Sequence, residues 1–152
     1  MKLAEALITR ADLQNKATQL KTRMAQNIKV EEDEEPAEEI ADLFYQYDAV
    51  MTELETTIIR INKTNEATVL DNDTLAGAIA KRDCLKAKIS TYRELIDKAS
   101  VLRERGYTRD EKVKYVRCMD ISELRKQADE MAKQYRELDI KMQGLNWTVE
   151  LL

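Results

Sequence analysis

The sequence predicts a mainly α-helical protein, either a long antiparallel four-helix bundle or helical hairpins, with a small two- or three-stranded β element at one end. Its 152 residues include three Gly and one Pro, too few for the turns of a β-sandwich or barrel. Only 5% are aromatic and 36% are charged, and four stretches repeat apolar residues every three or four positions. We expect one domain over residues 1–152.

The first two helices are expected over residues 2–27 and 37–63. Pro36 suits the first turn of the second helix, where a missing N–H has no partner to lose. The apolar stripe of this helix alternates spacings of four and three, the 3.5-residue period of a helix supercoiled against a partner. Its members are Ile40, Phe44, Tyr47, Met51, Leu54, Ile58 and Ile61.

The other two helices are expected over residues 75–102 and 121–143. Asp120 and Glu123 form a capping-box pattern at the start of the last helix, while Gly106 and Gly144 predict helix ends. The last helix carries the most regular heptad stripe of the chain. Its members are Ile121, Leu124, Ala128, Met131, Tyr135, Leu138, Met142 and Leu145.

Three short strands are expected over residues 67–70, 113–118 and 147–151. The first follows the polar segment that ends the second helix, β-branched and aromatic residues without a helical period favour the second, and an alternating pattern favours the third. Because an isolated strand is marginal, the three are expected to share one small sheet. The two cysteines, Cys84 and Cys118, form no C-x-x-C pattern and predict free thiols that are buried or half-buried.

Four segments resemble one family over nearly the whole chain: M-K-L-A-E-A-L-I-T-R-A-D-L-Q at residues 1–14, R-I-N-K-T-N-E-A-T at 60–68, K-V-K-Y-V-R at 112–117, and N-W at 146–147. They are similar to small uncharacterised bacterial helical proteins, some of which are labelled septicolysin. The resemblance implies the helical fold, and the label implies a pore-forming toxin. The residues themselves show neither a signal peptide nor a membrane-seeking segment, so we expect a cytoplasmic protein without a membrane partner.

The chain contains no His, which removes the commonest general base and transition-metal ligand. We therefore expect no catalytic residue, metal or cofactor. The alternative is an Mg²⁺-dependent nucleotide hydrolase, because carboxylates at Glu34, Glu35, Glu38, Glu94 and Asp97 partly match the spacing of all-α nucleotide pyrophosphatases. Against it, the residue before Pro36 is disfavoured in a helix.

The candidate ligand-binding residues lie where the second helix meets the first expected strand. Arg60 and Lys63, with nearby amides and hydroxyls, are suited to an anion or a sugar, and Arg117 joins them if the strands pair. The set is Arg60, Asn62, Lys63, Asn65, Thr68 and Arg117. The alternative is that Asn62, Thr64, Asn65 and Thr68 satisfy helix-end carbonyls and fix the chain reversal.

The function expected from these patterns is an oligomeric interaction or scaffold module whose partner is itself or another helical protein. Long heptad stripes are often completed by a second subunit, and Tyr45 lies where it extends one of them. A nucleic-acid-binding helical arm is the alternative. Residues 76–118 hold twelve Lys/Arg against six acids, whereas residues 31–39 hold seven carboxylates.

Overall fold

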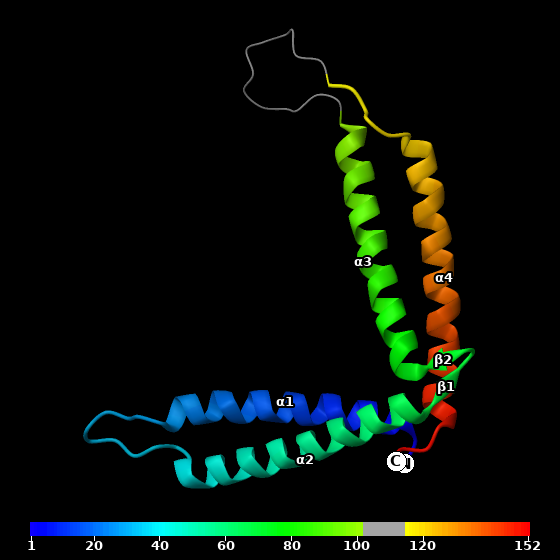
Figure 1. The fold of residues 1–152 in the computed structure, drawn as a ribbon. Coiled ribbons are helices and arrows are strands. Elements are labelled where there is room, and N and C mark those ends of the chain that lie inside the picture. The colour runs from blue at the N-terminus through cyan, green and yellow to red at the C-terminus, as the bar shows by residue number, and fades with distance from the viewer. Residues whose placement is uncertain (102–114) are drawn as a thin grey trace, which may run out of the picture. The chain divides into compact units, whose positions relative to one another are not determined.

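The structure is a computed structural model that describes residues 1–101 and 115–152. Figure 1 shows its four helices and one antiparallel pair of short strands. The elements are α1 (Leu3–Asn27), α2 (Ile40–Ala67), β1 (Val69–Leu70), β2 (Asp73–Thr74), α3 (Leu75–Ser100) and α4 (Ile121–Thr148). The prediction of a mainly α-helical protein with a small β element is confirmed.

The chain forms two compact units, one of residues Met1–Ala76 with Gln143–Leu152 and one of residues Gly77–Met142. In the first unit, α1 and α2 lie side by side as an antiparallel hairpin (Figure 1). The contact between the two helices is formed by buried leucine and valine side chains that recur every one or two helical turns, as expected for a pair of amphipathic helices. The core cluster consists of Leu13, Leu20, Leu43, Val50 and Leu54, flanked by Ala17, Met24, Ile40, Tyr47 and Ile58.

Two members of the stripe predicted for α2 lie outside this core. Leu43 and Val50 are 1% and 5% exposed, whereas their neighbours Phe44 and Met51 are 45% and 38% exposed. One residue turns a helix by about 100°, so Leu43 and Phe44 face different directions. The heptad of Leu43 and Val50 packs against α1, and the heptad of Phe44 and Met51 stays at the surface.

α2 begins at Ile40 rather than at residue 37, because the loop before it is held by side chains of α1. The Asn27 amide oxygen accepts a hydrogen bond from the Glu38 N–H at 3.0 Å. The Arg23 guanidinium pairs with the Glu38 carboxylate through two of its nitrogens, and this hydrogen-bonded pair lowers the pKa of Glu38. Residues 31–39 are therefore irregular, and Pro36 does not open the helix.

A tight hairpin follows α2, which ends at Ala67 rather than at residue 63. β1 pairs with β2 in the register Val69↔Thr74 and Leu70↔Asp73. Asp71 at the turn has a φ of 54°, a left-handed conformation that Asp and Asn adopt more readily than most residues. The strand expected at residues 67–70 is thus present over its last two residues, but its partner is β2.

The second unit is built from most of α3 and α4, which run side by side in Figure 1. The stripe predicted for α4 is buried or half-buried, and it faces an apolar stripe of α3 that includes Leu85, Ile89 and Ile96; α3 ends at Ser100. Arg82 interrupts the stripe of α3 and pairs with Asp83 at 2.9 Å and with Asp139 of α4 at 3.5 Å. The buried side chains of this unit are Ala78, Leu85, Ile89, Ile96, Ala128, Ala132 and Met142.

The strand expected over residues 147–151 is wrong, because α4 continues to Thr148. The Thr148 hydroxyl bonds the carbonyl oxygens of Gly144 and Leu145 at 3.3 and 3.1 Å, and Gly144 stays inside the helix. Beyond the helix the chain pairs with its own beginning through an isolated bridge between Lys2 and Glu150.

The second strand prediction, over residues 113–118, is also wrong where it can be compared: residues 115–118 form no strand. The Arg117 side chain in this segment donates to the Ala99 carbonyl near the end of α3 at 2.8 Å. Residues 113–114 and the helix end predicted at Gly106 lie outside the described residues. Cys84 and Cys118 are free thiols, as predicted, but both are exposed.

Candidate functional site

The polar segment predicted as a binding site lies in the last two turns of α2 and just after it. Thr64 is 1% exposed, and its hydroxyl donates to the Arg60 carbonyl at 2.8 Å. The Thr68 hydroxyl and N–H both donate to the Thr64 carbonyl, at 2.7 and 2.9 Å. The Thr68 carbonyl in turn accepts from the N–H of Leu75 at 2.7 Å. Thr64 and Thr68 therefore close the end of α2 and fix the start of α3.

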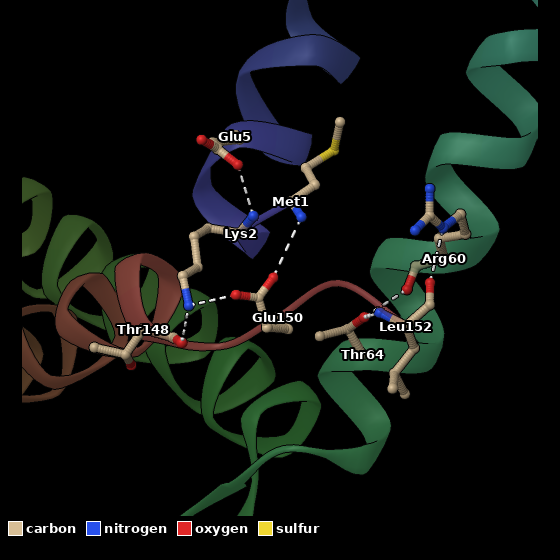
Figure 2. Close-up of polar contacts among 8 residues, drawn as sticks. All are labelled: Met1, Lys2, Glu5, Arg60, Thr64, Thr148, Glu150 and Leu152. Carbon is tan, nitrogen blue, oxygen red and sulfur yellow. Dashed lines mark hydrogen bonds and ion pairs between the residues drawn. The ribbon is translucent and has the colours of Figure 1, made fainter.

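The same segment holds the tail, residues 149–152, against α2 (Figure 2). The Arg60 Nε donates to the main-chain oxygen of Leu152 at 2.8 Å. The N–H of Leu152 donates to the Thr64 hydroxyl at 3.0 Å. The Thr64 hydroxyl thus both donates and accepts. Together, Thr64 and Arg60 bind the N–H and the main-chain oxygen of Leu152.

The start of the chain holds the other side of the tail, also drawn in Figure 2. The Glu150 carboxylate pairs with Lys2 Nζ at 2.6 Å and with the Met1 ammonium at 3.2 Å. The bond from Lys2, followed by the bond from the ammonium, lowers the pKa of Glu150. Backbone bonds of 2.9 Å from Leu3 to Val149 and from Leu151 to Met1 complete the contact.

The remaining candidate residues are placed differently from Arg60 and Thr68. Asn62 and Lys63 are exposed and Asn65 is half-buried. Arg117 belongs to the second compact unit, where its Nε donates to the Ala99 carbonyl at 2.8 Å. The strand pairing expected to bring Arg117 to the others is not formed, since β1 pairs with β2.

A groove of about 650 Å³ runs along α2 beside the tail. Its lining includes Arg60, Thr52, Thr56, Tyr45 and Asp48. Threonine hydroxyls form much of the groove wall, but those of Thr52 and Thr56 donate to carbonyl oxygens one turn back, at 2.9 and 3.0 Å. These hydroxyl hydrogens are therefore already used within α2.

The carboxylates considered as magnesium ligands are divided between the two compact units. Glu34, Glu35 and Glu38 lie in the first, and Glu94 and Asp97 in the second. Over residues 1–101 and 115–152, no group of three or more metal-binding side chains is present. Glu38 pairs with Arg23, and Glu94 accepts a hydrogen bond from the Ser90 hydroxyl at 3.1 Å.

Residues 10–151 match the profile of a protein family described as a family of unknown function, DUF6847. The chain belongs to this family. Among solved structures, it is similar to a functionally unknown conserved protein from Corynebacterium diphtheriae, with 38% identity and a TM-score of 0.92 over 100% of this chain and 99% of that one. No curated protein matches the chain. Neither name includes the septicolysin label, which stays a prediction.

The Corynebacterium structure agrees with the predicted helical fold. Neither its description nor that of the DUF6847 family names a ligand. Among the helices of the part that the structure describes, none is long and apolar enough to cross a membrane.

The sequence patterns did not identify Thr64 as the residue that binds the tail. The signal was present as a hydroxyl in an apolar stripe, one turn after Arg60, but its partner lies 88 residues away.

Proposed function

We propose that this protein is a helical interaction module that associates with a second copy of itself. The observation that carries the proposal is the α2 ridge, defined as Phe44, Met51 and Ile58, which recur every seven positions. Phe44 and Met51 are 45% and 38% exposed, whereas Ile58 is half-buried and packs against the α1–α2 core. Tyr45, beside the ridge, is 79% exposed. Exposed apolar side chains at heptad spacing are typical of a helix that packs against a further helix.

The charges beside the ridge favour a particular surface of the second copy. Asp48 and Glu55 lie between the ridge residues and are exposed, so a second α2 ridge would bring carboxylates together. α3 offers the complementary pattern: Lys81, Lys88 and Leu95 are all exposed and also recur every seven positions. The proposed contact therefore joins the α2 ridge of one copy to this face of α3 in another.

The composition of the two units supports the same pairing. The unit of Met1–Ala76 and Gln143–Leu152 contains eight Lys/Arg against seventeen Asp/Glu, while Gly77–Met142 contains seventeen against twelve. Opposite net charges steer encounter between copies and disfavour contacts between like units. The proposal assigns no catalytic residue, places the protein in the cytoplasm, and does not include the pore-forming activity that the septicolysin label implies.

Sedimentation velocity tests this proposal directly. We expect the wild-type chain at micromolar concentration to sediment as a species heavier than the 17.6 kDa monomer. Replacing both Phe44→Ser and Met51→Ser is expected to return it to the monomer. Ile8→Ser is the matched control, because Ile8 is an exposed residue of α1 outside the ridge, and this variant should assemble as the wild type does. A monomeric wild type, or a double variant that still assembles, contradicts the proposal.

Binding of nucleic acid is the second candidate, favoured by the cationic excess of Gly77–Met142. It predicts that the chain is retained on RNA at low salt and is released steeply as salt rises. Charge reversal at Lys81, Lys86 and Lys88 is expected to abolish the retention. A wild-type chain that is not retained on RNA at low salt contradicts this candidate.

A further inference from the structure

A second groove, of about 450 Å³, lies between α3 and α4 inside the unit of Gly77–Met142. Its floor is apolar: Ile89 and Ala132 are both 8% exposed. Ser90 and Tyr135 provide a hydroxyl and a half-buried ring at its sides. The small side chain of Ala132 leaves the hollow open, and its volume falls in the range of small-molecule sites, roughly 300–1,000 Å³.

The groove runs along α3 from Lys86 to Asp97, and its two carboxylates lie toward the Asp97 end beside Arg93. The pair between Arg82 and Asp139 sets the register of α3 and α4. Because the helices are antiparallel, Arg136 lies one turn further along, level with Lys86. Arg93 follows along the groove, and Glu94 and Asp97 line its far end. Eleven residues separate Lys86 from Asp97, which corresponds to about 16 Å along the helix axis.

Lys86, Arg93 and Arg136 form no ion pair with any acid of residues 1–101 and 115–152. In the part of the chain that the structure describes, the ion pairs of this unit are those of Arg82 with Asp83 and Asp139. Three side chains that carry unpaired positive charge around an apolar floor form a site for an anion with an apolar body.

We propose that the α3–α4 groove binds a nucleoside diphosphate. Lys86 and Arg136 hold the two phosphates, and the Tyr135 hydroxyl lies at the same end. The sugar lies over Ile89 and Ala132, and the Arg93 guanidinium stacks on the base. At the far end Glu94 and Asp97 accept hydrogen bonds from the amino group of the base. The proposal concerns binding alone and does not depend on self-association through the α2 ridge.

Calorimetry with the full chain, at low salt and without divalent metal, tests the site with three probes: ADP, pyrophosphate and adenosine. We expect ADP to bind more tightly than either pyrophosphate or adenosine, since only ADP fills both ends of the groove. Lys86→Gln and Arg136→Gln are each expected to weaken ADP binding about tenfold or more. Asp97→Asn should weaken ADP binding while leaving the affinity for pyrophosphate unchanged.

Two further variants separate a built site from general attraction to a cationic surface. Lys126→Gln and Lys133→Gln each remove one exposed positive charge from the same unit but outside the groove lining, and should leave ADP affinity unchanged. Ala132→Leu fills the floor without changing charge, and should abolish ADP binding while the helical circular dichroism and melting temperature show that the chain is folded.

Three results would overturn the proposal. The first is no binding of ADP at millimolar concentration. The second is an equal loss of ADP affinity in the Lys126, Lys133, Lys86 and Arg136 variants, which indicates attraction of any polyanion, including nucleic acid, to the unit as a whole. The third is wild-type affinity in a folded Ala132→Leu variant, because a ligand in the groove cannot share the space of the leucine side chain.

Discussion

Thr64 shows how one buried hydroxyl joins distant parts of the chain. It is 1% exposed, donates to Arg60 in its own helix and accepts from Leu152. A buried polar group is stable only while it is hydrogen-bonded, so the position of the tail is coupled to the end of α2. The same contacts use Arg60 and Thr68, two of the residues predicted to bind a ligand.

Replacing Thr64→Val keeps the shape of the side chain and removes both hydrogen bonds. Because the N–H of Leu152 then lacks its partner, we expect the free energy of unfolding to fall by about 1–2 kcal/mol. Chemical denaturation should show a lower midpoint with an unchanged slope. Thr56→Val is the matched control: the Thr56 hydroxyl also bonds one turn back, but Thr56 is exposed and its side-chain hydrogen bond goes to Thr52 rather than to the tail. Equal losses in the two variants would contradict a role for Thr64 in holding the tail.

The Glu150 contact is expected to weaken in acid. Its pKa lies below the usual 4.5, so its contribution to stability is complete above pH 4.5 and is lost as the pH falls through the lowered pKa. Trp147, the only tryptophan of the chain, lies three residues away and reports the change through its fluorescence. The titration of Glu150→Gln should lack this acidic component of the wild-type curve. Identical curves would exclude the contact.

Among the elements, α2 shows which part of the fold follows from sequence pattern and which part does not. Period and length predicted the four helices, because long amphipathic stripes bury one face whatever they pack against. The pattern did not separate Leu43 from Phe44, since both heptads are apolar and only the placement of α1 selects one. The strand prediction for residues 147–151 was wrong for a related reason. The alternating pattern of apolar and polar residues there does reflect strand-like pairing, but the partner is Lys2 at the other end of the sequence.

Adjacent substitutions in α2 test its two faces. Leu43→Ala leaves a cavity in a core where Leu43 is 1% exposed, and we expect a loss of about 2–5 kcal/mol in the free energy of unfolding. Phe44→Ala removes a side chain that is 45% exposed and should cost distinctly less. Denaturation at a concentration low enough to prevent association isolates this difference. A larger loss for Phe44→Ala would place α1 on the other face.

At the scale of the whole molecule, the charges are divided between the two units rather than mixed. The acidic unit has nine more carboxylates than cations and the basic unit has five more cations than carboxylates. The sequence predicted this uneven distribution because charge counts need no fold. It could not predict the groove between α3 and α4, which depends on the register fixed by Arg82 and Asp139.

Salt is expected to weaken self-association if the α2 ridge, with the carboxylates of Asp48 and Glu55 beside it, contacts the basic face of α3 in another copy. Raising the ionic strength from about 0.01 to 1 M shortens the screening length from about 30 to 3 Å, so the average mass in solution should fall. Light scattering over a salt series measures it. A mass that rises with salt would indicate a purely apolar contact instead, such as one between two α2 ridges.

The measurement that tests the central claim most directly is the oxidation rate of Met51 at low and high protein concentration, followed by mass spectrometry. Met51 lies in the ridge and is 38% exposed, while Met119 is 65% exposed, lies outside the ridge and serves as the internal control. Our account predicts that Met51 becomes protected as concentration rises while the rate at Met119 stays constant. An unchanged rate at Met51, in a sample whose mass shows that it has assembled, would contradict the claim that the α2 ridge forms the contact.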